Sequence, residues 1–107
     1  MSQIQPRNHS AIITGSARGI GRAIAIRLAK DGFDIALNDL PTSLGELEVV
    51  AESIRALGRQ VIIVPGDVSN EQLVDEMVEK TVENLGYLYV VGCTFPDPFS
   101  IPIKYIT

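Results

Sequence analysis

Short apolar runs alternate with segments of helical periodicity along most of this chain, and that alternation restricts the possible folds more than any other feature. Residues 11–14, 35–37 and 61–64 form apolar runs of the length of buried strands, and residues 87–91 form a fourth. Each of the first three is followed by a segment with apolar side chains at helical spacing. Strands and helices in such alternation indicate a parallel sheet with right-handed crossovers. We therefore predict an α/β fold, a Rossmann-type parallel sheet that forms half of a doubly wound fold, with strand order 3-2-1-4.

The three predicted helices have recognisable ends and inward faces. Gly32 is placed to end the first helix, over residues 19–30, and Gly58 to end the second. The second and third helices each open on a predicted capping box: Ser43-x-x-Glu46 and Ser69-x-x-Gln72. The side chains expected to face the sheet are Ile20, Ile24 and Leu28 in the first helix, Leu47, Val50, Ile54 and Leu57 in the second, and Leu73, Met77 and Val78 in the third.

A glycine-rich turn separates the first predicted strand from the first helix. Its pattern, Thr14-Gly15-x-x-x-Gly19-x-Gly21, is not G-x-G-x-x-G, nor is it a P-loop, which needs a Gly-Lys pair. Gly15 would allow the chain to turn sharply after the strand. Gly19 would allow a pyrophosphate to approach the backbone, and Gly21 would allow the helix to pack close to the sheet. The free amides at the positive end of the helix would then face a diphosphate. The turn thus predicts the following cofactor-binding residues, with an ordinary glycine-rich turn as the alternative: Gly15, Ser16, Arg18, Gly19, Ile20 and Gly21.

Asp39 follows the second predicted strand, where a carboxylate can accept hydrogen bonds from the ribose hydroxyls of an adenosine. The same carboxylate would repel a 2′-phosphate, which favours NAD over NADP. Arg18 favours NADP if its guanidinium pairs with that phosphate, or it is a solvated cation that strengthens diphosphate binding. We expect NAD as the cofactor, with NADP second. The alternative for Asp39 is a turn residue before Pro41.

Asp67 and Val68 follow the third predicted strand after Gly66. The Asp67 carboxylate can accept a hydrogen bond from the exocyclic amine of an adenine, while Val68 packs against the ring. Ordinary turn chemistry before a helix explains the same pair equally well. We include both residues among the candidate cofactor-binding residues.

Together, the glycine pattern, Asp39 and the Asp67-Val68 pair resemble the short-chain dehydrogenase/reductase family over about residues 10–86. The resemblance implies a Rossmann-type NAD(P)-binding region in an oxidoreductase that acts on small alcohols or carbonyls. Among the members of the family, the chain looks most similar to diacetyl/acetoin-type or 3-oxoacyl-type reductases. The resemblance also implies a catalytic serine and a Tyr-x-x-x-Lys pair, in which the lysine lowers the tyrosine pKa.

The residues of that reaction centre are not found in this sequence. No tyrosine is followed by a lysine four residues later. Ser100 therefore lacks the tyrosine and lysine that a catalytic serine of this family requires. Family members carry an Asp and then Asn-Ala-Gly in the fourth strand, where this chain has Tyr89 and Thr94-Phe95-Pro96. We therefore predict no catalytic residue, expect the chain to be inactive alone, and expect a carbonyl or alcohol substrate only in a full-length form.

Charge and cysteine content exclude several other classes of function. The net charge of −4 argues against a nucleic-acid partner, because there is no basic surplus to contact phosphates. No apolar run approaches the ~20 residues that span a bilayer, and no signal peptide is visible, so we expect no membrane partner and a cytoplasmic protein. A single cysteine cannot form an internal disulfide or a zinc site, and we expect no metal.

Composition changes abruptly at Gly86. Beyond it only Asp97 and Lys104 are charged, and three of the chain's prolines fall within residues 96–102. We expect a dinucleotide-binding half-domain over residues 1–86 and a divergent apolar, proline-rich tail over residues 87–107, as in a truncated family member. Such a chain would leave part of its sheet uncovered and prone to self-association. The alternatives are a non-catalytic module that pairs with a full-length relative and a non-functional truncated product.

Overall fold

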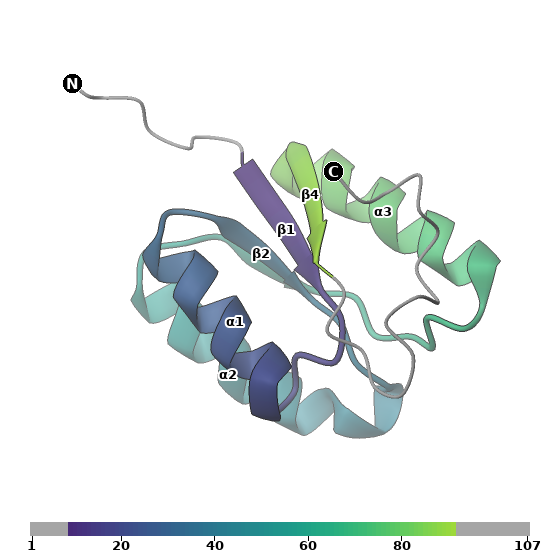
Figure 1. Ribbon diagram of the computed structural model, residues 1–107, viewed down its shortest axis with the longest axis horizontal. Helices are drawn as coiled ribbons and strands as arrows, with labels where there is room; N and C mark the ends of the chain where they lie inside the picture. Colours follow the sequence, from purple (N-terminus) through teal and green to yellow (C-terminus); the bar gives the residue numbers. More distant parts are fainter. Residues whose placement is uncertain (1–8, 92–107) are drawn as a thin grey trace.

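The computed structural model describes residues 9–91 and shows one parallel sheet with helices on both faces (Figure 1). The strands are β1 (His9–Ile13), β2 (Asp34–Leu37), β3 (Val61–Ile63) and β4 (Tyr87–Val91). The helices are α1 (Gly19–Lys30), α2 (Leu44–Ala56) and α3 (Glu71–Leu85), and a short 3₁₀ helix, η1 (Pro41–Ser43), precedes α2. The strand order is β3-β2-β1-β4, which confirms the predicted fold class and strand order.

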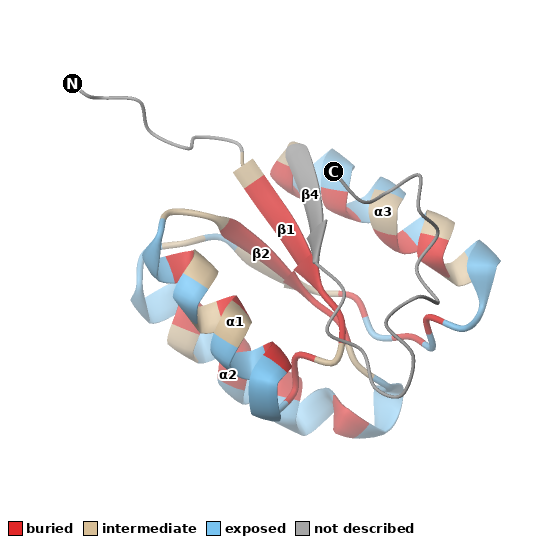
Figure 2. Ribbon diagram, viewed as in Figure 1, coloured by how far each residue is buried: buried red, intermediate tan, exposed pale blue. Residues whose placement is uncertain are grey.

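The two inner strands contribute alternate side chains to two separate cores. β1 pairs in parallel with β2 on one side and with β4 on the other, so the carboxyl ends of these strands meet at one edge of the sheet. Figure 2 shows β1 and β2 buried along almost their whole length, whereas β3 has intermediate burial. Successive side chains of a strand point to opposite faces, and accordingly Ile12 and Ala36 belong to one core while Ile13 and Leu37 belong to the other.

The two faces of the sheet are covered unequally. α1 and α2 lie together on one face, and α3 lies on the other (Figure 1). The predicted inward residues Leu47, Val50 and Ile54 are fully buried in α2. Leu57 was expected beside them, but it is 42% exposed. The physical reason is that α2 ends at Ala56, so Leu57 is already the cap residue.

The buried face of α1 differs from the predicted stripe by one position. Small residues form it: Gly21, Ala25 and Ala29. Ile20 is 76% exposed, and Ile24 and Leu28 pack only at the margin of the core. Small side chains allow the helix axis to lie close to β1 and β2, which large side chains in those positions would prevent.

The predicted end of α1 at Gly32 is confirmed. Gly32 has a φ of 103°, its amide donates to the Ala29 carbonyl, and the Phe33 amide donates to the Leu28 carbonyl. This pair of bonds is the Schellman arrangement, which favours glycine at the residue of positive φ.

Both predicted capping boxes are wrong. Ser43 makes no side-chain cap bond, because η1 runs directly into α2. The N-cap of α3 is Asn70 rather than Ser69, and its side chain accepts a hydrogen bond from the Leu73 amide at 3.2 Å. In α3 Met77 is buried as expected, but Val74 takes the inward place predicted for Leu73.

β4 lies beyond the change in composition at Gly86 and is nevertheless part of the sheet, since it pairs with β1 over five residues. The rest of the tail, with Cys93 and Ser100, lies outside the described residues. Within residues 9–91 no helix is long and apolar enough to cross a membrane. In the same part of the chain no three His, Cys, Asp or Glu side chains gather as a set of metal ligands.

Candidate functional site

The carboxyl ends of β1 and β2 bring the glycine-rich turn beside Asp39, at the edge of the sheet where parallel α/β folds bind ligands. Gly15 and Gly19 both have a φ of 65°, a conformation that glycine adopts at little cost. The turn therefore leaves β1 and enters α1 in a way that side chains at these two positions would oppose.

Gly21 permits the close contact between α1 and the turn. A Cβ atom at this residue would collide with the carbonyl oxygen of Gly15 and lie 2.7 Å from its carbonyl carbon. Because the obstacle is backbone, it cannot rotate away as a side chain can. The requirement for glycine here is therefore one of space between the helix and the turn.

Within residues 9–91, the backbone amides at the N-terminus of α1 have no acceptor. The N-cap, Arg18, makes no side-chain cap bond, and the first turn contains no acidic residue. The amide of Arg22 donates to the Arg18 carbonyl, so the amides of Gly19, Ile20 and Gly21 precede the helical ladder. A Cβ added to Gly19 would meet nothing within 4 Å. The geometry thus provides open space beside unpaired donors, which suits an anion.

Two other amides of the turn have partners within the protein. The Ser16 amide donates to the Asn38 carbonyl at 2.9 Å, and the Ala17 amide donates to the Asp39 carboxylate at 3.1 Å. The Ser16 side chain is fully buried, and its hydroxyl donates to the Asn38 carbonyl and accepts from the Asn38 amide. Ser16 therefore faces the protein and fixes the turn to the end of β2.

The side chain of Asn38 joins the end of β2 to the loop that follows β3. This residue was not among those predicted from the sequence. Its side chain is buried, and Nδ2 donates to the carbonyls of Val64 at 2.9 Å and Gly66 at 3.2 Å. Nδ2 also lies 3.2 Å from the Met77 sulfur. The sequence offered one sign of this role, a side-chain amide directly after an apolar strand. A buried amide at such a place needs hydrogen-bond partners.

The carboxylate of Asp39 can accept hydrogen bonds from a ligand in addition to those that it accepts from the protein. Oδ2 accepts from the Ala17 amide, and Oδ1 accepts from the Leu40 amide at 2.8 Å. An ionised carboxylate offers about four acceptor positions, so about two remain. Asp39 is only half-buried, and the remaining positions are within reach of a ligand.

The side chain of Arg18 is exposed and forms an ion pair. Its guanidinium lies 3.3 Å from the carboxylate of Glu46 in the first turn of α2. Glu46 was predicted to complete a capping box, and the structure instead places it in this ion pair. Ile20 is exposed at the same end of α1.

Asp67 and Val68 have roles within their own loop. The Asp67 Oδ1 accepts from the Ser69 amide at 2.9 Å, and Val68 packs into the core beneath α3. The bond from the Ser69 amide, together with the Ser69 hydroxyl, holds the pKa of Asp67 below its usual value of 3.8. This is the turn chemistry that the sequence left open, and Asp67 remains exposed.

The lowered pKa of Asp67 gives a testable pH dependence. Because the carboxylate form is favoured by folding, Asp67 stabilises the chain above pH 3.8, and this contribution is lost as the pH falls through the lowered pKa. A carboxyl titration by NMR should give a midpoint below 3.8. Ser69→Ala should raise it only part of the way, since the amide bond remains; a midpoint at or above 3.8 in the unmodified chain would contradict this assignment.

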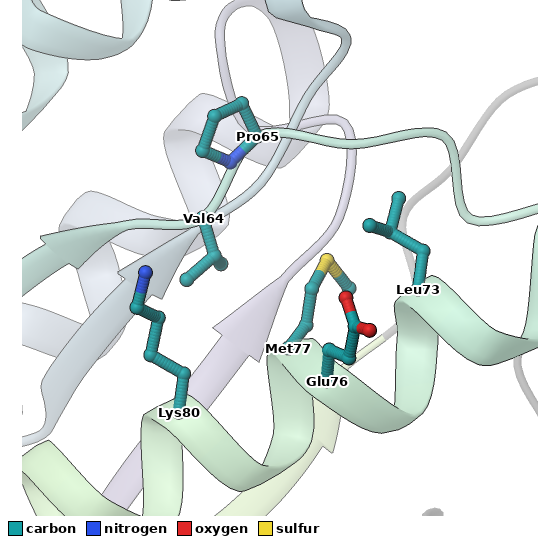
Figure 3. Close-up of a pocket in the computed structure, with 6 residues that line it drawn as sticks. All are labelled: Val64, Pro65, Leu73, Glu76, Met77 and Lys80. Carbon is teal, nitrogen blue, oxygen red and sulfur yellow. The ribbon is translucent and has the colours of Figure 1, made fainter.

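A small cavity lies away from the turn, between the loop after β3 and α3 (Figure 3). Its volume is ≈ 120 Å³, whereas small-molecule sites are typically about 300–1,000 Å³. It is lined by Val64, Pro65, Leu73, Glu76, Met77 and Lys80. We therefore locate the candidate site at the turn and Asp39 rather than in this cavity.

A parallel sheet in the order 3-2-1-4, with a glycine turn at the first strand and an uncapped helix after it, is the arrangement of a Rossmann-type fold. The family model for short chain dehydrogenase matches residues 9–92, and the chain belongs to this family. Its relatives include the short-chain dehydrogenase/reductase eriH of Hericium erinaceus, 59% identical over 71% of this chain, and a second from Armillaria gallica, 49% identical over 78%. These alignments cover 31% and 32% of the relatives, so the chain spans about a third of their length.

Solved structures of the same family contain either form of the cofactor. A carveol dehydrogenase from Mycobacterium avium in complex with NAD is 30% identical, with a TM-score of 0.72 over 82% of this chain and 36% of that one. L-Sorbose reductase from Gluconobacter frateurii, complexed with NADPH and L-sorbose, is 33% identical, with a TM-score of 0.72 over 82% and 34%. The family resemblance predicted from the sequence is confirmed, but the relatives do not decide between NAD and NADP.

Proposed function

We propose that this chain forms the dinucleotide-binding part of a short-chain dehydrogenase/reductase and holds the adenosine diphosphate portion of NAD at the glycine-rich turn. The observation that carries the proposal is the N-terminus of α1, where the amides of Gly19, Ile20 and Gly21 have no helical acceptor and a Cβ added to Gly19 would meet nothing within 4 Å. The positive end of the helix dipole adds to the attraction for a diphosphate.

Each candidate residue has a role in this proposal. Gly15 and Gly21 shape the turn, Ser16 anchors it, and the amides of Gly19, Ile20 and Gly21 bind the diphosphate. The remaining acceptor positions of Asp39 bind the ribose hydroxyls. The exposed carboxylate of Asp67 accepts the adenine amine at an acceptor position that Ser69 does not use, and Val68 packs this loop into the core. When bound, the nicotinamide supplies hydride transfer to or from a carbonyl or alcohol.

NAD is the preferred cofactor in this proposal because of the charges next to the ribose position. The Asp39 carboxylate disfavours a 2′-phosphate, and Arg18, which can favour one, is engaged by Glu46. Since relatives are known with each cofactor, the preference rests on these residues alone.

We also propose that the chain does not catalyse the reaction by itself. Tyr87 and Tyr89 are not followed by a lysine four residues later, so neither has the partner that the family uses for proton transfer to the substrate oxygen. The substrate that we propose for a full-length form is a small carbonyl or alcohol of the diacetyl/acetoin or 3-oxoacyl type.

Calorimetric titration of the chain with NAD and with ADP-ribose tests the proposal. We expect binding with a Kd on the order of 1 mM, since only part of a full site is present. Asp39→Ala should weaken ADP-ribose binding about ten-fold, as expected when a charged hydrogen-bond acceptor is removed. The control is Asp31→Ala, an exposed carboxylate after the far end of α1.

Absence of binding, or equal binding by the Asp39 and Asp31 variants, would overturn the proposed site. NAD-linked turnover of a carbonyl substrate by the purified chain would overturn the proposed lack of catalysis.

A further inference from the structure

The ion pair between Arg18 and Glu46 links the glycine turn to the start of α2. Arg18 Nη2 lies 3.3 Å from Glu46 Oε1, and the two side chains are 71% and 49% exposed. The Asp39 carboxylate contacts the same turn, because it accepts a hydrogen bond from the amide of Ala17, the residue before Arg18. We call Asp39, Arg18 and Glu46 the charge cluster of this turn.

The charges of this cluster do not balance. One guanidinium against two carboxylates leaves a net charge of −1, which repels an added phosphate. Glu46 already neutralises part of the charge of Arg18, so a 2′-phosphate would have to share the guanidinium with this carboxylate or displace it. A neutral 2′-hydroxyl meets neither penalty.

We infer that Glu46 is a specificity-determining residue, which withholds Arg18 from a 2′-phosphate and so makes the site select the non-phosphorylated dinucleotide. The inference rests on the proposed dinucleotide site and assigns its selectivity to a residue outside the glycine turn. Glu46 also lies in the first turn of α2, where a carboxylate complements the helix dipole. That second role is structural and does not distinguish the two dinucleotides.

The expected size of the effect follows from the exposure of the pair. Exposed ion pairs contribute at most about 1 kcal/mol, which corresponds to a change of about five-fold in a binding constant. Glu46→Gln should therefore tighten NADP binding about three- to five-fold and change NAD binding less than two-fold. The gain should shrink as ionic strength rises, because exposed charges are screened.

The test measures the Kd of the full chain for NAD and NADP in four forms: unmodified, Glu46→Gln, Arg18→Met and the double variant. Arg18→Met alone should leave the NADP to NAD ratio within about two-fold, and in the double variant it should abolish the gain made by Glu46→Gln. Glu52→Gln is the matched control, because it also breaks an ion pair on α2, to Arg55 at 3.4 Å. It should leave the ratio unchanged.

The outcomes separate this inference from the proposed function. Intact NAD binding with an unchanged NADP to NAD ratio in Glu46→Gln would overturn the inference alone. A gain of equal size in Glu52→Gln would also overturn it, since general charge reduction would then be the cause. If the unmodified chain binds neither dinucleotide, the proposed function fails and the inference fails with it.

Discussion

Replacing Gly21 with alanine is expected to destabilise the chain by about 3 kcal/mol, at the upper end of the usual cost of overpacking. The added methyl group would collide with the carbonyl oxygen of Gly15, and neither backbone segment can move without disturbing β1 or α1. The same displacement would move the amides proposed to bind the diphosphate. Urea unfolding followed by circular dichroism measures the loss, and titration with ADP-ribose should show no binding.

Gly45 provides the matched control, since it lies in α2 and a Cβ there would meet nothing within 4 Å. Gly45→Ala should raise the free energy of unfolding by about 0.5–1 kcal/mol, as helix propensity predicts. If Gly21→Ala were as stable as Gly45→Ala, the close contact between α1 and the turn would be refuted.

Replacing Asn38 with aspartate should cost about 3 kcal/mol or more at neutral pH. The two side chains have the same shape, but a carboxylate oxygen would replace Nδ2 opposite the carbonyls of Val64 and Gly66. A buried charge without a donor is costly, and both carbonyls lose their partner. Thermal unfolding across a pH series measures the cost, which should decrease in acid as the new carboxyl becomes protonated.

Asn84→Asp is the control for this substitution. The Asn84 side chain donates to the Lys80 carbonyl, but it is exposed on α3 and water can replace the bond. We expect a cost of at most about 1 kcal/mol, part of it from a negative charge near a helix C-terminus. Equal costs for the two variants would show that Asn38 does not hold the ends of β2 and β3 together.

The sheet and its helices could be predicted because each rests on a local pattern. β1, β2 and β3 are apolar runs, and their separation by helical segments leaves few topologies. The predicted inward stripe of α1 was wrong, because a stripe of large side chains and a neighbouring stripe of small ones fit the same periodicity. In α1 the close approach required by Gly21 decides in favour of the small residues.

Only part of the candidate site could be predicted from the sequence. Glycine spacing and the position of Asp39 predicted the turn and its neighbour at the end of β2. The side-chain bonds of Asn38, and the ion pair between Arg18 and Glu46, join residues more than 25 positions apart. They depend on which loops meet at the edge of the sheet, and no local pattern in the sequence specifies that.

The central claim is that the backbone amides at the start of α1 bind a nucleotide diphosphate. The most direct measurement is a titration of the ¹⁵N-labelled chain with ADP-ribose, followed amide by amide in ¹H–¹⁵N spectra. The account predicts the largest shifts at Gly19, Ile20 and Gly21, with smaller shifts near Asp39, and no comparable response to adenosine at the three helix amides. Shifts confined to Leu73, Met77 and Lys80 at the cavity beside α3, with the start of α1 unchanged, would contradict it.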